Sequence, residues 1–477
     1  MKKLSIYIIV GLLFVSISCE DFMDINTSPN DPSSAPVELI FPAAAGSAAY
    51  VIGGWYQILG GMWSQHWTQS TGSSQYRNVD SYDLQNDAFD DRQFGELYIG
   101  SLSDLEFIRK TSKADENWSY YLMATVMQAY VFQVLVDLYD QVPFTDALKG
   151  DEGTLTPKYD NGQTIYDSLI NRIDVALSKD MNALTVQQPG KDDVIFQGNL
   201  NRWIQFANTL KLKIYMRQSE ARPAVASAGI QSLFADPNFL TVDASFKAFK
   251  DEEDNRNPLY ETGFDRLSGN ISISNTLFSF LESTNDPRID SIMKFPKNTP
   301  AAHNTLVQGN YLASSPTNID GLSTPAIEPL DAVYFISKFE SYFLQSEAVV
   351  RYGVAGDAEE FYQLAIDASF VKFQSNGDPD DVYGPGQPFE FPTAGTEDEK
   401  IEAIIVQKWV AMANSQGLES FFEQNRTGYP DFFTPAVNNV TNDEFPRRLF
   451  YPESERARNP TNVPAKEPLT EPVWWAQ

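Results

Sequence analysis

The segment SKFESYFLQSEAVVRYGVAGDAEEFYQLAIDASF, residues 337–370, is the most informative stretch of the chain for its fold. Its apolar residues recur every three or four positions, which is the spacing of one face of an α-helix. Gly353 interrupts this pattern, and Asp357 is a residue type that caps helix N-termini. We therefore expect one helix over 337–352 and a second over 357–370. The apolar face of the first helix consists of Phe339, Tyr342, Phe343, Ser346 and Val350.

The second of these helices has an internal order of small and aromatic residues. Ala358, Tyr362 and Ala365 follow the small–aromatic–small spacing of the second helix of a tetratricopeptide repeat. The turn from Gly353 to Asp357 has the short length that such a repeat requires, although no proline follows at the expected offset. The segment is thus similar to a tetratricopeptide-like helix pair.

Helical periodicity continues along much of the chain and indicates an all-α fold. Apolar faces recur in 165–177, 203–214 and 401–412. The segment Trp118–Tyr139 is apolar almost all round, so it must be considered as a membrane span. Its few polar residues form a narrow stripe, which favours a buried core helix instead. The tryptophan pair at 474–475 is expected to dock on the folded body.

The composition excludes several classes of protein. The chain has 477 residues, with 35 Lys and Arg against 64 Asp and Glu, which gives a formal net charge of -29. It therefore lacks the basic face that nucleic-acid binding requires, and it cannot attach to anionic lipid through a polybasic patch. A hydrophobic content of 42% is enough for a globular core. With one Cys and two His, the chain cannot form an internal disulfide and is poorly equipped for a Cys- or His-rich metal site.

The N-terminus resembles the export signal of a bacterial lipoprotein. Two lysines precede an apolar run over 4–17, and the single cysteine, Cys19, lies where this run ends. This order predicts a signal peptide over 1–18 and acylation of Cys19 after cleavage, although Ser16 stands where such signals usually have Leu. Several acyl chains hold a protein stably on a membrane, because each buried methylene contributes about 0.8 kcal/mol. The alternative is an ordinary signal peptide with an incidental cysteine.

The mature chain is expected to have two parts. Residues 19–40 carry the lipid and are rich in Pro and small polar residues, which predicts a flexible tether. Residues 41–477 form the folded body, whose length exceeds that of one hydrophobic core and predicts several lobes or an extended helical stack. Periodicity fades over about 226–335 and 374–397, where we expect long loops of the kind that often carry function.

No residue pattern of a catalytic or cofactor site stands out. A serine hydrolase would need a Ser beside His66 or His303, and the chain has no Gly-x-Ser-x-Gly elbow. His66 lies among Trp and Gln residues, where packing or sugar contact fits better than base catalysis, and His303 lies in a polar loop where we expect it to be solvated. No phosphate-binding loop or dinucleotide fingerprint is present, so no cofactor is expected. The acidic runs at 251–254 and 378–381 lack the spacing of a calcium loop and are interpreted as solvated charge.

Residues suited to sugar recognition are concentrated in 55–82. An aromatic ring covers the apolar face of a sugar, while amides and Arg bond its hydroxyls. Most aromatic residues of a helical protein are core, and the eight-residue spacing of Trp55 and Trp63 places both on one helical face, toward the core. The residues that follow lie in a segment broken by Gly and Ser. The first candidate patch there consists of Trp67, Gln69, Tyr76, Arg77 and Tyr82.

A second candidate patch lies in the loop-prone region. Asn257, Tyr260 and Arg266 combine amide, aromatic and Arg side chains there. A polar turn capped by the neighbouring proline explains the same residues equally well. Tyr311 and Tyr334 flank the other long loop and are weaker candidates. No residue is assigned a catalytic or metal-binding role.

Five stretches of the chain together resemble the SusD/RagB-type lipoproteins of Bacteroidetes. Their order and spacing extend from Cys19 to about Asn462, nearly the whole mature chain, whereas each stretch alone is a modest match. The acidic pair that follows Cys19 also resembles the surface-export signal of these lipoproteins. The stretches are CEDF (19–22), DLYDQVPF (137–144), FANTLKL (206–212), QNRTGYP (424–430) and FPRRLFYP (445–452).

The resemblance implies a right-handed stack of tetratricopeptide-like helix pairs with a loop-rich ligand face. It implies a non-enzymatic lipoprotein that is anchored in the outer membrane and exposed at the cell surface. Its ligand would be a nutrient, either an oligosaccharide or in some branches a peptide, delivered to a SusC-like TonB-dependent β-barrel transporter. Two alternatives stay open. One is a lipid-anchored all-α glycoside hydrolase, which needs only two nearby carboxylates, and the other is a helical scaffold that binds protein segments.

Overall fold

The computed structural model describes residues 35–84 and 91–476. Helices dominate these residues, and their short strands pair only in twos, so the all-α expectation is confirmed. The expected signal peptide and Cys19 lie outside the described residues. The expected tether, 19–40, ends earlier than the sequence suggested, because a helix begins at Val37.

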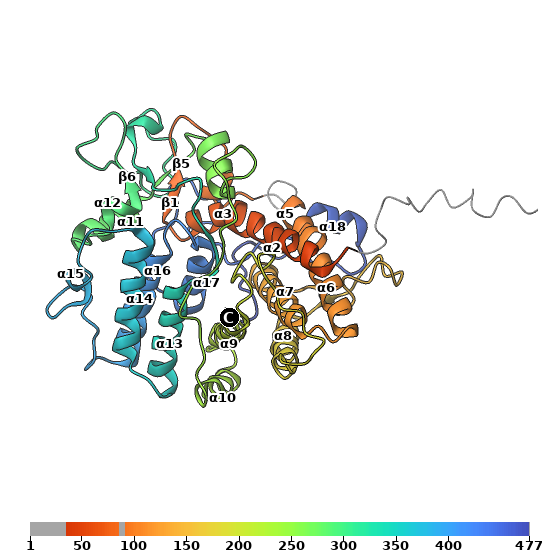
Figure 1. The fold of residues 1–477 in the computed structure, drawn as a ribbon. Coiled ribbons are helices and arrows are strands. Elements are labelled where there is room, and N and C mark those ends of the chain that lie inside the picture. Colours follow the sequence, from red (N-terminus) through yellow and green to blue (C-terminus); the bar gives the residue numbers. More distant parts are fainter. Residues whose placement is uncertain (1–34, 85–90, 477) are drawn as a thin grey trace, which may run out of the picture.

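The first part of the chain forms the helices α2 (Val37–Gly53), α3 (Trp55–Trp63), α4 (Arg77–Asp80), α5 (Asp91–Glu96), the π-helix η1 (Leu97–Leu102), α6 (Ser103–Ala114), α7 (Trp118–Tyr139), α8 (Gly162–Leu177), α9 (Leu200–Arg217) and α10 (Pro223–Phe234). Neighbours in sequence pack together: α6 on α7, α7 on α8, and α9 on α10. Figure 1 shows α2 and α3 running above α7, α8 and α9, with the C-terminus beside α9.

The second part contains the π-helix η2 (Tyr260–Arg266), α11 (Asn275–Ser283), α12 (Ile289–Ile292), the short 3-10 helix η3 (Ile319–Gly321), α13 (Lys338–Tyr352), α14 (Ala358–Phe373), α15 (Asp380–Tyr383), α16 (Glu397–Met412), α17 (Gly417–Thr427) and α18 (Glu453–Arg458). The predicted helix pair is confirmed as α13 and α14, which pack on each other. The Ser337 side chain caps α13, Gly353 ends it with a left-handed φ of 59°, and Asp357 caps α14 by accepting from two backbone N–H groups.

Eight short strands form four antiparallel pairs that tie loops to one another: β1 (Trp67–Gln69) with β5 (Ile271–Ile273), β2 (Val142–Pro143) with β3 (Tyr159–Asp160), β4 (Ala244–Phe246) with β8 (Val333–Ile336), and β6 (Met293–Lys294) with β7 (Thr324–Pro325). In the β1–β5 pair Thr68 lies opposite Ser272. Figure 1 shows β1, β5 and β6 at the upper side of the molecule, above α14 and α16.

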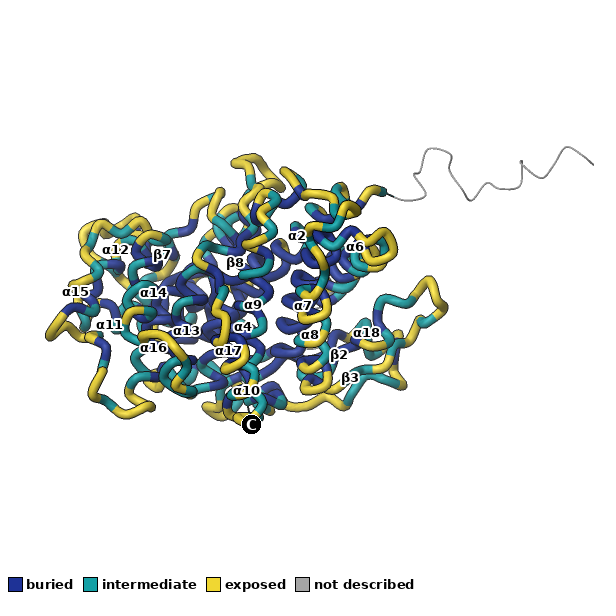
Figure 2. Tube along the Cα trace, turned by 60° about the horizontal axis from the view of Figure 1, so that its bottom comes forward, coloured by how far each residue is buried: buried dark blue, intermediate teal, exposed yellow. Residues whose placement is uncertain are grey.

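The central core helix is α7. Among the described residues, two helical stretches are long and apolar enough to cross a membrane, Val37–Trp63 and Trp118–Tyr139. The most apolar window of the second stretch is buried inside the protein throughout, and Figure 2 shows α7 in the dark blue of buried residues. The expected core helix is therefore confirmed. In the first stretch, which comprises α2 and α3, 56% of the corresponding window is buried.

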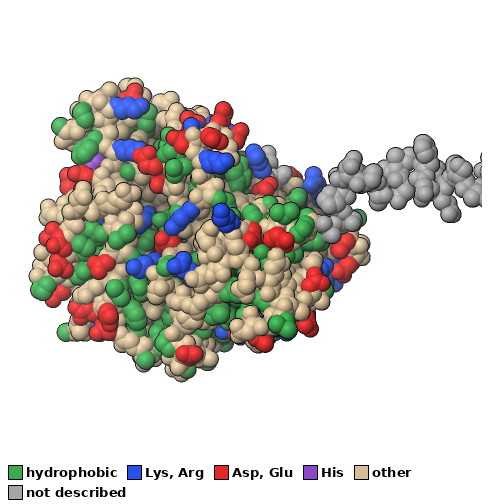
Figure 3. Space-filling model, in the orientation of Figure 1, with side chains coloured by type: hydrophobic (Ala, Val, Ile, Leu, Met, Phe, Trp, Pro, Cys, Tyr) green, Lys and Arg blue, Asp and Glu red, His purple; other side chains and the backbone are tan. Residues whose placement is uncertain are grey.

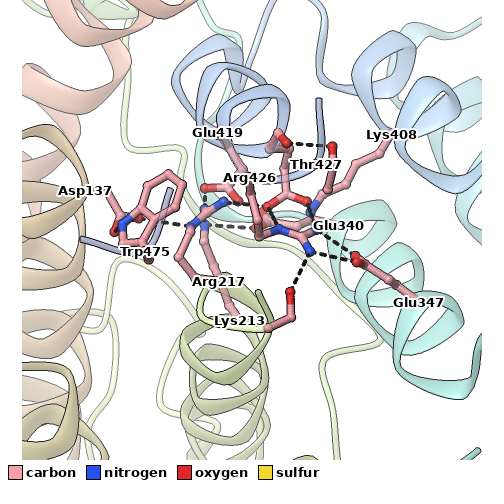
Figure 4. Close-up of polar contacts among 12 residues, drawn as sticks. Asp137, Lys213, Arg217, Glu340, Glu347, Lys408, Glu419, Arg426, Thr427 and Trp475 are labelled. Carbon is pink, nitrogen blue, oxygen red and sulfur yellow. Dashed lines mark hydrogen bonds and ion pairs between the residues drawn. The ribbon is translucent and has the colours of Figure 1, made fainter. Parts of the chain in front are cut away.

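A group of buried ionised side chains joins α7, α9, α13, α16 and α17 (Figure 4). Arg217 lies among three carboxylates: its Nε is 3.2 Å from Asp137, its Nη2 is 2.5 Å from Glu419 and its Nη1 is 2.5 Å from Glu423. Buried charges are tolerated only when they are paired, so this group fixes the relative positions of five helices. We call it the central charge network: Asp137, Lys213, Arg217, Glu340, Glu347, Lys408, Glu419, Glu423 and Arg426.

Burial and ion pairing act in opposite directions on the pKa values of the network's carboxylates. Burial alone would raise the pKa of Glu423, but the cations Arg426, Lys408 and Arg217 hold that pKa well below its ordinary value. Burial outweighs the pairing at Asp137, whose pKa is raised to about 6 although Arg217 opposes the shift. The ionised state of each carboxylate in the network therefore depends on its cationic partners staying in place.

The C-terminal tail closes this network from one side. The Trp475 indole is buried, its Nε1 donates to Asp137 Oδ1 at 2.8 Å, and its ring lies 5.2 Å from the Arg217 guanidinium. The Trp474 backbone N–H donates to Asp140 Oδ1 at 2.9 Å. The expected docking of the tryptophan pair is confirmed.

Candidate functional site

Three loop regions lie together above the helices, on the side of β1 and β5 in Figure 1. We call them the loop layer: 64–84, 247–274 and 295–325. Backbone and side-chain hydrogen bonds join them, from Ser70 N to Asn270 O at 2.7 Å and from Thr71 Oγ1 to Pro316 O at 2.6 Å. The layer is therefore a connected structure and not a set of independent loops.

Asp80 is a buried residue that joins the parts of this layer, and no local sequence pattern pointed to it. Its carboxylate accepts from Thr68 Oγ1 at 2.7 Å, from Gln69 N at 3.0 Å and from Gln308 Nε2 at 2.6 Å. Burial raises the pKa of Asp80 to about 7, although these hydrogen bonds oppose the shift. One side chain thus holds β1 against the loop that contains Gln308.

Four residues of the first candidate patch are core residues, which corrects their expected role as ligand contacts. Trp67, Gln69, Tyr76 and Tyr82 are all buried. Trp67 packs so tightly on α3 that a Cβ at Gly61 would lie 2.4 Å from its ring. The Gln69 and Tyr82 side chains are bonded to backbone, since Gln69 Oε1 accepts from Tyr76 N and the Tyr82 hydroxyl accepts from Ala436 N. These side chains therefore shape the loop layer from below.

Arg77 is the one member of that patch at the surface. It is half-buried, its Nε donates to Ser73 O at 3.1 Å, and its guanidinium lies 5.1 Å from the centre of the Tyr311 ring. Such cation–π contacts hold an Arg side chain in place while leaving other N–H donors free to bond. Tyr311, a weaker candidate in the sequence, is thereby brought beside a stronger one.

The second candidate patch borders a cavity of about 390 Å³, here called the arginine cavity. Arg266 lines it, together with Arg92 and Arg256. Aromatic walls come from Tyr50 on α2 and from Phe246 and Phe249, whose ring centres are 5.2 Å apart. The other lining residues are Gly46, Ala248, Asp254, Asn255, Pro258, Glu261 and Thr262.

Ion pairs organise the cavity's cations. Arg256 lies 2.7 Å from Asp251 and 3.0 Å from Asp265, and Arg266 lies 3.1 Å from Glu261. Arg266 also pairs with Asp254. The acidic run at 251–254 is thus partly used as counter-charge for these arginines. The face drawn in Figure 3 has Lys and Arg side chains gathered near its middle and acidic ones mostly toward its margins, although the whole chain is acidic.

The other two members of the second patch have separate roles. Asn257 is buried: its Nδ2 donates to Asp331 O at 2.8 Å and its Oδ1 accepts from Leu259 N and Tyr260 N. We expected Asn257 to contact a ligand, but its side chain instead caps the helical turn that leads into η2. Tyr260 is half-buried, and the Arg256 guanidinium lies 6.0 Å from its ring centre. π-Helices such as η2 are often found at functional sites, and η2 supplies Glu261, Thr262 and Arg266 to the arginine cavity.

Both histidines have a serine partner, yet neither serine hydroxyl can act as a nucleophile. His66 Nδ1 lies 3.1 Å from Ser64 Oγ, but both residues are fully buried, and burial lowers the pKa of His66 to about 3. His303 bonds Asp290 and Ser323 at 3.0 Å each, an arrangement that resembles a catalytic triad. The expectation that His303 is simply solvated is therefore corrected. Ser323 is fully buried, so its hydroxyl cannot reach a substrate. Within 35–84 and 91–476, no group of three or more His, Cys, Asp or Glu is placed to hold a metal ion.

Comparison with known proteins gives the family. A sequence model of the SusD-like family, described as starch-binding and associating with the outer membrane, matches residues 29–452. The chain belongs to the SusD-like family. Among curated proteins the sequence has no significant match.

Several solved structures share the fold across nearly their whole length. A chitin-binding SusD homologue from Flavobacterium johnsoniae is 22% identical, with a TM-score of 0.77 over 92% of this chain and 98% of its own. A SusD-like protein from Bacteroides thetaiotaomicron is 21% identical, with a TM-score of 0.76 over 92% and 98%. A SusD homologue from Bacteroides uniformis is 19% identical, with a TM-score of 0.74 over 92% and 98%. At these identities the likeness establishes the fold, and tetratricopeptide-like helix pairs are part of it.

Proposed function

We propose that this protein is a lipid-anchored, surface-exposed binding protein that captures an oligosaccharide at the loop layer and passes it unchanged to a SusC-like TonB-dependent transporter. Membership in a family described as starch-binding and outer-membrane-associated supports the ligand class and the location. Two of the similar structures are themselves described as chitin-binding. The lipid anchor at Cys19 rests on the sequence pattern alone.

The observation that carries the proposal is the lining of the arginine cavity. Its rings can cover the C–H face of a sugar, and its guanidinium and amide groups can donate to hydroxyls. Because Arg256 and Arg266 are already held by carboxylates, they are positioned before any ligand arrives, which reduces the entropy lost on binding. Binding needs no covalent step, in keeping with the burial of Ser64 and Ser323.

The test is a titration of the purified protein with maltohexaose, chitohexaose and short peptides. Phe249→Ala and Arg266→Ala should each weaken sugar binding about tenfold, since each removes one stacking or charge-assisted contact of about 1–2 kcal/mol. Phe107→Ala is the matched control, because Phe107 is an aromatic residue on α6 with 39% exposure and lies outside the cavity lining. Binding of peptides only would replace the sugar with a peptide ligand, and release of shortened glycans would show an enzyme.

Anchoring and transfer have their own test. A Cys19→Ser variant should lose metabolically incorporated palmitate and leave the membrane fraction. The acylated protein should co-purify with a TonB-dependent β-barrel from detergent-solubilised outer membranes. Retention of Cys19→Ser in the membrane, or a partner that is not a β-barrel, would contradict this part of the proposal.

A further inference from the structure

A second cavity, of about 410 Å³, lies beside α11 and outside the arginine cavity. Its apolar surface comes from Val307 and from two aromatic rings, Phe280 and Phe432, here called the phenylalanine platform. Their ring centres are 5.2 Å apart and the ring planes differ by 18°, so the two rings are stacked. Phe432 is 37% exposed, so part of this stack faces solvent.

The platform is rigidly supported from below. The buried Trp409 ring lies edge-on to both members of the stack, at 5.5 Å from each ring centre. Gln65 ties the two sides of the cavity together: its Nε2 donates to Thr434 O at 2.6 Å and its Oε1 accepts from Thr276 Oγ1 at 2.7 Å. The two rings therefore stay in place without a ligand, which reduces the entropy lost when a ligand stacks on the exposed ring.

The rim of this cavity is polar and entirely uncharged. Its nine lining residues include no Asp, Glu, Lys or Arg, although charged residues make up 21% of the chain. Hydroxyl and amide groups surround the two rings instead, from Asn275, Thr276, Ser279, Ser283, Gln308 and Thr434. An apolar plate ringed by neutral donors and acceptors matches a neutral ligand that has one C–H face and several hydroxyls.

We propose that the phenylalanine platform is a second ligand site, which stacks against one ring of a neutral sugar. The proposal takes the ligand class from the proposed function, but the place of binding is independent of the arginine cavity. A charged ligand would gain no counter-charge here, and a protein partner would have to cover a patch with no ionic rim to orient it. A long oligosaccharide that reaches both sites would be held more tightly than a short one.

The experiment is an equilibrium titration with maltohexaose and chitohexaose on purified wild type and variants. Phe432→Ala should weaken binding of the sugar that wild type prefers by about three- to tenfold, and Phe432→Trp should retain it because a larger ring keeps the plate. Phe295→Ala is the matched control: Phe295 is 39% exposed and stacked on His303, and it does not line this cavity. Ser279→Lys, which places charge and bulk on the exposed rim, should weaken binding as Phe432→Ala does and covers the case in which that variant fails to fold.

The two proposals fail in different ways. Equal affinity in wild type, Phe432→Ala and Ser279→Lys, together with a loss in Phe249→Ala, would overturn the platform and leave the proposed function standing. Equal losses in Phe432→Ala and Phe295→Ala would also overturn it, since the effect would not be specific to the stack. Absence of sugar binding in wild type would overturn both proposals.

Discussion

The central charge network makes Arg217→Met the most informative stability variant. Methionine keeps much of the side-chain volume but removes the cation that faces Asp137, Glu419 and Glu423. Glu419 keeps Lys213 at 2.8 Å and Glu423 keeps Arg426 at 2.6 Å, so the loss falls mainly on Asp137. Breaking one buried ion pair costs about 3–5 kcal/mol, and we expect a loss of unfolding free energy in that range at pH 8.

The pH dependence of this loss has a definite sign. The pKa of Asp137 is already raised to about 6 by burial, and removal of Arg217 must raise it further. A raised folded-state pKa means that the folded protein binds a proton more readily than the unfolded chain, so protonation at lower pH relieves the unpaired charge. The difference between wild type and Arg217→Met should therefore shrink as the pH falls from 8 to 5.

The assay is urea unfolding followed by circular dichroism at pH 8, 6.5 and 5. Arg222→Met is the matched control, because Arg222 pairs with Asp167 at 2.8 Å near the surface, where the two side chains are 19% and 53% exposed. Such a pair is worth about 0–1 kcal/mol. The reasoning is refuted if Arg217→Met costs no more than Arg222→Met, or if its cost is the same at pH 8 and pH 5.

Three further changes probe other parts of the fold by unfolding measurements. Trp475→Ala should lower the free energy of unfolding by about 3–5 kcal/mol, because it empties a buried site. Trp474→Ala, at the half-buried neighbour, should lower it clearly less. Equal losses would contradict the closing role of Trp475. Asp80→Asn should flatten the pH dependence of stability between pH 4 and 7. The raised pKa of Asp80, about 7, makes the wild type lose stability as the pH rises through this range. Parallel stability curves for wild type and Asp80→Asn would show that Asp80 does not titrate there. Gly417→Ala should lower the unfolding midpoint strongly, since its Cβ would lie 2.5 Å from Gly61 N, whereas Gly150→Ala meets nothing within 4 Å and should be near neutral; similar midpoints would argue against the close α3–α17 crossing.

The helices could be predicted because their signals are local. The apolar spacing and the caps at Ser337 and Asp357 lie within the helices that they define, and α7 was visible from its uniform apolarity. The helix α11 was not anticipated, because it lies in a region where Pro, Asn and Ser hide the periodicity. Local patterns therefore predicted the helical framework better than the loop layer.

The candidate site was harder to predict, because composition does not reveal which side of a ring faces solvent. Trp67 combines with Gln69 as a sugar site would, but its Nε1 bonds Asn414, a residue 347 positions away that no local pattern connects to it. Arg266 of the second patch lies at a cavity, and its acidic partners are close to it in sequence, but its role in binding stays a prediction. The Phe280–Phe432 stack was missed for the opposite reason, since its two rings come from distant segments.

The central claim is that the loop layer binds an oligosaccharide without altering it. The most direct measurement is calorimetric titration of the wild-type protein with maltohexaose and chitohexaose, followed by chromatography of the recovered sugar. The account predicts saturable binding of at least one of them and recovery of the sugar at its original length. Failure of both sugars to bind, or the appearance of shorter products, would contradict it.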